Sequence, residues 1–214
     1  MSTDTVEKLA LLTLGWLLGM LGPVVTDAIK KRRENALVKI ALDSELREIS
    51  CMLALASYLV HDHFGTVDRT YLQWFLDVTA NYDGPNRLET VQSSIETQLS
   101  LTDEQLAALV QARKANKGTN IVVRKFVVPL LDARVSSLWY FENRVQILLL
   151  DIRSNINLLN ELVDQGRYYG GLTFGKLENE NYERVVANRD GCHRQYAERA
   201  KMIVTKIEEL GSLA

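Results

Sequence analysis

The most constraining feature of the chain is an uncharged, largely apolar run of 18 residues near its N-terminus. Residues 9–26 read LALLTLGWLLGMLGPVVT and contain no Asp, Glu, Lys or Arg. As an α-helix this run is roughly 27 Å long, close to the ~30 Å hydrocarbon core of a bilayer. We therefore expect residues 9–26 to form a single transmembrane helix.

The charges on either side of the run predict its orientation. Residues 1–8 carry two acidic residues and one lysine, whereas a basic cluster follows the run, made of Lys30, Lys31, Arg32 and Arg33. Basic flanks stay in the cytoplasm. We therefore expect the N-terminus outside, the bulk of the chain in the cytoplasm, and the basic cluster against anionic headgroups of the cytoplasmic (inner) membrane.

Three other interpretations of residues 9–26 stay open. A cleaved signal peptide has a basic start and a small-residue cleavage site, whereas this chain starts acidic. An interfacial amphipathic helix needs a polar face, for which the run offers only Thr13 and Thr26. A buried core helix of a soluble protein is the strongest rival, because Trp16 lies in mid-run and three glycines weaken the helix.

The three glycines of the run fall on nearly one side of the expected helix. They are Gly15, Gly19 and Gly22. Glycine lets two helix backbones approach closely in lipid, where packing drives association. The spacing favours self-association in the membrane, with incidental glycines on a lipid-facing helix as the alternative.

Composition limits the class of the remaining chain. The 214 residues are 47% hydrophobic and 24% charged, which excludes disorder. A mean hydropathy of -0.07 excludes a polytopic membrane protein, and a pI near 6.0 with a net charge of -2 disfavours a nucleic-acid binder. Two cysteines, Cys51 and Cys192, are too few for a disulfide framework.

Apolar spacing predicts helices over most of residues 34–137. One helical stripe runs from residue 34 to residue 60 and ends at Gly65, a typical helix stop. Short helices are expected over residues 66–80 and 87–99, and Thr102 with Gln105 predicts a capping box that starts another. Residues 121–128, IVVRKFVV, are strand-like in composition, but no partner strand exists in the sequence, so we expect a helix that continues past Pro129 with a kink.

Two long helical seams mark the C-terminal half. The first consists of Leu138, Phe141, Val145, Leu148 or Leu149, Ile152, Ile156, Leu159 and Val163. The second consists of Tyr182, Val186, Arg189, His193, Tyr196, Ala200, Ile203, Ile207 and Leu210. Steps of three and four predict an antiparallel coiled-coil hairpin, with helices at residues 122–165 and 176–211 and a glycine-rich tip at 166–175. The exposed aromatics of that tip, Tyr168, Tyr169 and Phe174, either pack back on the bundle or dock a partner.

Few residues suggest chemistry. His61, Asp62 and His63 could ligate a metal, but residues two apart on a helix point to different sides, so a role at the helix end is favoured. Adjacent Cys192 and His193 seldom hydrogen-bond on a helix, so a nucleophile and base pair is disfavoured. The sequence predicts no catalytic residue, no metal and no cofactor.

The sequence thus predicts an all-α protein with a membrane anchor at residues 1–33 and a cytosolic helical bundle at residues 34–214. The favoured function is a non-catalytic, membrane-anchored scaffold or sensor that binds an unidentified protein partner and can form a homo-oligomer, with no nucleic acid. One alternative is a membrane-acting effector, whose plan resembles in outline the small membrane effectors of bacterial toxin and antiviral defence systems. A second alternative is a helical metal-dependent enzyme that uses residues 61–63.

Overall fold

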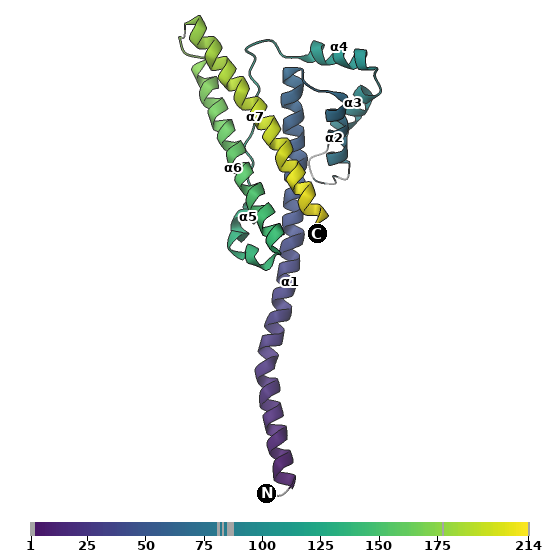
Figure 1. The fold of residues 1–214 in the computed structure, drawn as a ribbon, viewed down its shortest axis with the longest axis vertical. Coiled ribbons are helices and arrows are strands. Elements are labelled where there is room, and N and C mark those ends of the chain that lie inside the picture. The colour runs from purple at the N-terminus through teal and green to yellow at the C-terminus, as the bar shows by residue number, and fades with distance from the viewer. Residues whose placement is uncertain (1–2, 81, 83, 85–87, 177, 214) are drawn as a thin grey trace. The chain divides into compact units, whose positions relative to one another are not determined.

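A computed structural model describes residues 3–80, 82, 84, 88–176 and 178–213; the side chains at positions 3–10, 17, 18 and 21–24 lie outside the description (Figure 1). All regular structure in these ranges is helical, which confirms the all-α expectation. The elements are α1 (Thr3–Phe64), α2 (Arg69–Thr79), α3 (Glu89–Leu99), α4 (Asp103–Arg113), α5 (Pro129–Arg134), a 3-10 helix η1 (Val135–Tyr140), α6 (Asn143–Leu172) and α7 (Asn179–Ser212). The chain divides into two compact units, Met1–Leu42 and Asp43–Ala214.

The first unit consists of the N-terminal part of α1. Most of its described large apolar side chains are exposed, from 52% at Ile29 to 77% at Leu12, whereas Leu42 at its end is buried at 2%. Across the described residues, no helix is both long and apolar enough to cross a membrane, so the structure does not support the expected transmembrane helix. Eight positions of the expected span (9, 10, 17, 18 and 21–24) lie outside the described side chains.

The C-terminal part of α1 belongs to the second unit and carries the expected apolar stripe. Leu46, Ile49, Leu53 and Val60 are buried. The helix ends where predicted, because Gly65 adopts a φ of +65°, which L side chains rarely adopt. The N–H of Thr66 then donates to the carbonyl of His61 at 2.9 Å and satisfies one of the terminal acceptors.

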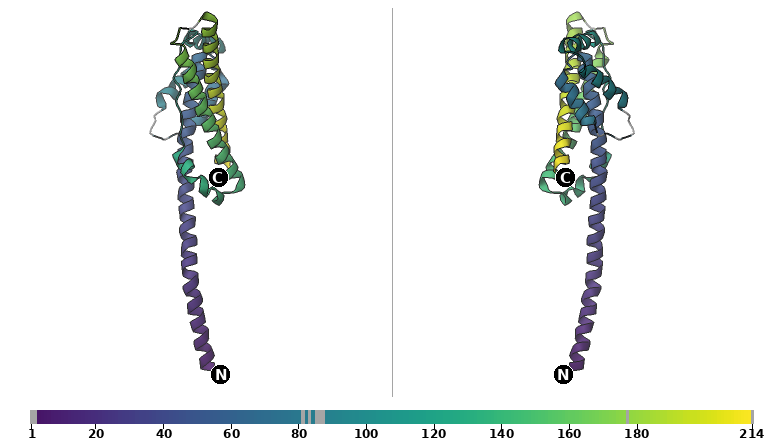
Figure 2. Two further views of the ribbon diagram at one scale, coloured as in Figure 1. Left: turned by 90° about the vertical axis from the view of Figure 1, so that its left-hand side faces the viewer. Right: turned by 90° about the vertical axis from the view of Figure 1, so that its right-hand side faces the viewer.

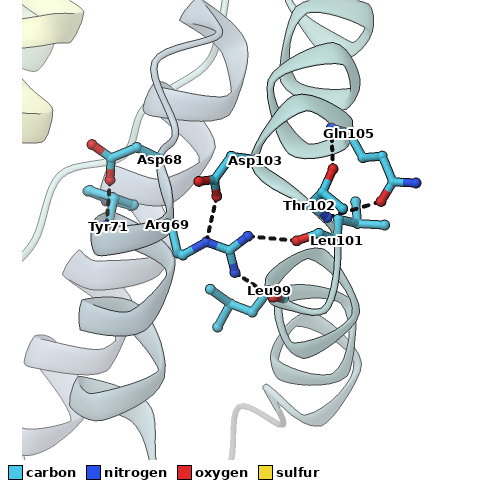
Figure 3. A network of polar contacts seen from close by, with 8 residues as sticks. All are labelled: Asp68, Arg69, Tyr71, Leu99, Leu101, Thr102, Asp103 and Gln105. Carbon is cyan, nitrogen blue, oxygen red and sulfur yellow. Dashed lines mark hydrogen bonds and ion pairs between the residues drawn. The ribbon is translucent and has the colours of Figure 1, made fainter.

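Helices α2, α3 and α4 form an arm whose ends are fixed by local caps. The Asp68 carboxylate accepts from the N–H of Tyr71 at 2.7 Å and caps α2. Arg69 donates to the carbonyls of Leu99 and Leu101, at 2.5 and 2.6 Å, just after α3 (Figure 3). The predicted capping box at Thr102 is present and starts α4. Arg69 therefore stabilises the connection between α3 and α4 from across the arm.

The arm packs on α1 through an apolar cluster. Its buried members are Ala54, Tyr58, Val67, Tyr71, Leu72, Phe75, Ile95, Leu106 and Val110. Burying one large side chain of this kind stabilises a fold by roughly 1.5–3 kcal/mol. A hydroxyl chain crosses the same interface: the Tyr71 hydroxyl donates to Ser57 Oγ (2.8 Å), which donates to the carbonyl of Ala197 on α7 (3.0 Å).

Helices α6 and α7 form the expected antiparallel pair and lie side by side in both sets of views (Figures 1 and 2). Most seam residues are buried, including the polar pair Arg189 and His193 at 2% and 3% exposure. The two expected seams therefore face a common core.

The expected single helix at 122–165 is wrong before residue 143. Residues 121–128 are neither helix nor strand, and α6 begins only at Asn143. Pro129 explains the break, because it has no N–H to donate and its ring disfavours helix at the preceding residue. Val128 accordingly adopts φ -124° and ψ 68°, and Pro129 starts the short helix α5.

The expected glycine-rich tip at 166–175 is also wrong, because α6 continues to Leu172. Gly166 and Gly170 are buried within it. A Cβ at Gly166 would lie 3.3 Å from His193 Nε2, which is tight contact. Gly166 therefore serves close packing between α6 and α7 rather than chain reversal, and an added Cβ at Gly170 would lie 3.8 Å from Asn120 Nδ2.

Candidate functional site

The residues that link α4 to α5 lie along the hairpin and are attached to it at their start by a buried arginine. Arg189, on α7, donates to the carbonyls of Gly118 (3.2 Å) and Thr119 (3.1 Å). Its charge is balanced by Asp190 at 2.7 Å. Gly118 has a φ of +87°, so the turn needs glycine at this position.

Residues 121–128, here called the extended segment, are then held by both helices of the hairpin. The Tyr196 hydroxyl of α7 donates to the carbonyl of Arg124 at 3.0 Å. Asn160 of α6 binds Phe126 twice: the N–H of Phe126 donates to Oδ1 (2.9 Å) and Nδ2 donates to the carbonyl (2.7 Å). Lys125 pairs with Asp164 at 2.6 Å. The segment is thus fixed in place without being part of a sheet.

The spacing of the contacts shows how stretched the chain is. Lys117 contacts Glu183 and Arg124 contacts Tyr196. The two α7 positions are about 20 Å apart at the helical rise. Seven residues of the linking chain cover that length, or about 2.8 Å each, which is nearer the ~3.3 Å of a strand than the ~1.5 Å of a helix.

The hydrogen-bonded backbone groups of the extended segment all lie on one edge. In an extended chain, the N–H and C=O of neighbouring residues point to opposite edges. Residues 124 and 126 bond to the hairpin. Within the described part of the chain, the backbone groups of Ile121, Val123, Lys125 and Val127 have no hydrogen-bond partner. The segment therefore presents a free edge of strand type, here called the odd edge.

An open cleft of about 900 Å³ lies between α1 and the first half of the extended segment. Its lining is Met52, Leu55, Ala56, Leu59, Asp62 and His63 of α1, with Leu88, Arg113, Ala115, Ile121, Val122, Val123 and Arg124. One wall is aliphatic, and Leu59 and Val122 are 49% and 86% exposed. The volume is in the range of pockets that bind ligands.

The cleft has few charged groups, and they differ in whether an opposite charge lies beside them. Asp62 pairs with Arg113 at 3.0 Å, so these two charges balance each other. Arg124 is exposed, and its guanidinium lies 4.8 Å from the centre of the Phe126 ring. Among the described residues no carboxylate pairs with Arg124, so the cleft carries one uncompensated positive charge.

The three residues 61–63 take different partners, as their helical spacing predicts. His61 Nδ1 lies 2.9 Å from Thr66 Oγ1, and its Nε2 is 3.8 Å from Glu198, too far for a hydrogen bond. Burial lowers the His61 pKa. Asp62 pairs with Arg113, and His63 lines the cleft. Across the residues described, no three His, Cys, Asp or Glu side chains are grouped as metal ligands.

Cys192 and His193 are both buried and do not contact each other through a hydrogen bond in the described residues. Cys192 Sγ lies 3.9 Å from Gln165 Oε1, and burial raises its pKa. Burial, with Arg189 nearby, lowers the His193 pKa to about 4. A protonated thiol and a neutral seam imidazole are not an activated nucleophile and base.

The other predicted site residues lie apart from the cleft. A Cβ built at Gly15 or Gly19 would meet no atom within 4 Å, and Gly22 lies among the positions of α1 whose side-chain surroundings are outside the description. Lys30, Lys31, Arg32 and Arg33 are exposed on α1. Tyr168 is 65% exposed, Tyr169 is half-buried, and their rings contact edge to face. Phe174 is 92% exposed, beyond the end of α6.

The cleft itself was missed from the sequence. Its signal was present in residues 121–128, whose β-branched composition predicts strand geometry without supplying a partner strand. Such a segment, if held extended, leaves backbone groups unpaired.

Comparison of the chain with models of known protein families, with characterised proteins and with solved structures finds no match.

Proposed function

We propose that this chain is a non-catalytic, membrane-anchored interaction protein. Its N-terminal helix would hold residues 43–214 at the cytoplasmic face of the inner membrane, and the cleft would bind a protein partner. The observation that carries the binding role is the open cleft with its exposed aliphatic side chains Leu59 and Val122. Exposed apolar area concentrated in a concave site is typical of binding surfaces.

The anchoring role rests on sequence and exposure together. Residues 9–26 are uncharged, and described side chains such as Leu11, Leu12 and Leu14 are more than half exposed. Exposed leucines of this density are costly in water and favourable in lipid. Lys30, Lys31, Arg32 and Arg33 would then lie at the headgroups, each with about 1 kcal/mol of attraction to an anionic surface.

Membrane anchoring is tested by fractionation of cells that express the full chain. We expect the protein in the membrane fraction, resistant to a carbonate wash. Deletion of residues 9–26 should move it to the supernatant. Recovery of the intact chain in the supernatant would refute the anchor.

Partner binding is tested with a photo-crosslinking residue at Leu59, which lines the cleft. Leu150 is the matched control, because it is 44% exposed on α6 and lies outside the cleft. We expect one discrete adduct from position 59, none from position 150, and loss of the adduct when Ala56→Trp fills the cleft. Equal adducts from both positions would contradict a specific site.

A second candidate function is a membrane-acting effector whose N-terminal helices oligomerise. The open space beside Gly15 and Gly19 favours it, because nothing within 4 Å keeps another helix from these positions. Induction of the protein should then depolarise cells, and Gly15→Leu with Gly19→Leu should abolish the effect. Normal membrane potential throughout would exclude this function.

A further inference from the structure

We infer that the odd edge of the extended segment accepts a strand from the partner protein. This inference rests on the proposed function and names how the partner binds. The incoming segment would be extended, would alternate apolar residues, and would carry a carboxylate opposite Arg124. No strand of this chain fills the place among the residues described.

The first argument is the hydrogen-bonding state of the segment. On the even-numbered edge, Tyr196 binds the carbonyl of Arg124 and Asn160 binds both backbone groups of Phe126, and these bonds hold the segment in an extended path. The groups of Val123, Lys125 and Val127 on the opposite edge have no partner in the described chain. A pre-ordered strand with one free edge is the arrangement that strand addition uses, because no ordering cost remains on the receiving side.

The second argument is the position of the cleft. Four consecutive residues, 121–124, line it. Successive side chains of an extended chain point to opposite faces. Four consecutive residues can therefore line one cleft only if their main chain also forms part of the wall. Apolar side chains of an added strand would then lie against Met52, Leu55 and Leu59 on the facing wall.

The third argument is charge, and it decides between two occupants. A second copy that paired antiparallel around position 124 would place Arg124 directly opposite Arg124 of the other copy. Like charges directly opposite destabilise a strand pair. Lys125 already pairs with Asp164, whereas Arg124 has no carboxylate among the described residues. An acidic, apolar segment of a different protein fits this edge better than the chain itself.

The test uses the full chain in detergent micelles and a displayed library of random seven-residue peptides. We expect enrichment of peptides with alternating apolar residues and one Asp or Glu. Methylation of alternate backbone amides in a selected peptide keeps every side chain but removes donors, and should weaken binding at least tenfold. Failure to enrich any peptide would overturn the inference.

Amide hydrogen exchange supplies a residue-specific readout. On peptide binding, the amides of Val123, Lys125 and Val127 should exchange at least tenfold more slowly, while those of Val122 and Arg124 should not change. If only the amides of α1 exchange more slowly, and the methylated peptide binds as well as the unmethylated one, the peptide binds through its side chains alone. That result would overturn strand addition. Protection that grows with protein concentration alone would show a second copy instead.

The charge is tested by Arg124→Glu, with Arg134→Glu as the control. Arg134 is also exposed but lies on α5, outside the cleft. Arg124→Glu should weaken the acidic peptide at least fivefold and strengthen a version with Lys in place of the acid, whereas Arg134→Glu should do neither. The two proposals can fail separately. If a peptide binds but the crosslinker at position 59 gives no adduct in cells, strand addition is supported and the proposed function, which requires a cellular partner, is not.

Discussion

Asn160→Ala should loosen the extended segment, and the size of the effect follows from its two hydrogen bonds. Asn160 satisfies both the N–H and the carbonyl of Phe126, at 2.9 and 2.7 Å. Phe126 is only 6% exposed, so water replaces these bonds poorly. Leaving a buried backbone group unpaired costs about 1–3 kcal/mol. Because both contacts are partly buried, we take the low end and expect about 2 kcal/mol in total.

The matched control is Asn157→Ala on the same helix. Asn157 is exposed, and replacing it with Ala brings the same gain in helix propensity as at Asn160, about half a kcal/mol. The difference between the two variants therefore isolates the contacts with Phe126. With an m-value of about 2 kcal/mol/M in urea, the two midpoints should differ by about 1 M.

The measurement is urea unfolding of both variants in the same detergent, followed by circular dichroism. Amide exchange at Phe126 should also accelerate in Asn160→Ala and not in Asn157→Ala. If both variants unfold at the same urea concentration and Phe126 exchanges at the same rate, the segment is not held by Asn160. Asn160 would then not be what keeps the odd edge rigid, and Asn160→Ala would leave peptide binding unchanged.

Three further predictions concern stability and can be read by urea unfolding. Arg189→Ala should cost about 3 kcal/mol, because it leaves the carbonyls of Gly118 and Thr119 without donors; an unchanged midpoint would contradict this. Thr102→Ala should cost about 1 kcal/mol by removing the cap of α4, whereas Thr102→Ser should restore it. The pKa of His193 is about 4 when folded and about 6.5 when unfolded, so only the unfolded chain takes up the proton between these values. Stability should therefore be full above about pH 6.5 and fall toward pH 4, and His193→Gln should flatten this decline; parallel pH profiles would argue against a buried neutral imidazole.

Much of the fold could be predicted because it depends on local patterns. The capping box at Thr102 is a contact between residues three apart. The stop at Gly65 needs only a backbone conformation that glycine favours. The seams of α6 and α7 follow the helical period, and a buried Arg189 and His193 fit that register despite their polarity.

The errors arose where distant residues decide the backbone conformation. Gly166 and Gly170 favour a loop in the sequence because glycine weakens helices, but in the structure Gly166 packs against His193 of α7 and Gly170 lies beside Asn120. The sequence predicts a helix at residues 121–128 because it offers no strand to pair with them. The sequence alone does not show that side chains can replace a partner strand.

Local pattern by itself determined the helical class, the apolar N-terminal run with its basic flank, and the two seams of the C-terminal pair. Tertiary structure alone decided the path of the extended segment and, with it, the cleft and the free odd edge. The physical reason is that the side chains that hydrogen-bond to the backbone of the extended segment lie far from it along the chain. Asn160 is 34 residues from Phe126, and Tyr196 is 72 residues from Arg124, so their hydrogen bonds exist only once the hairpin has formed.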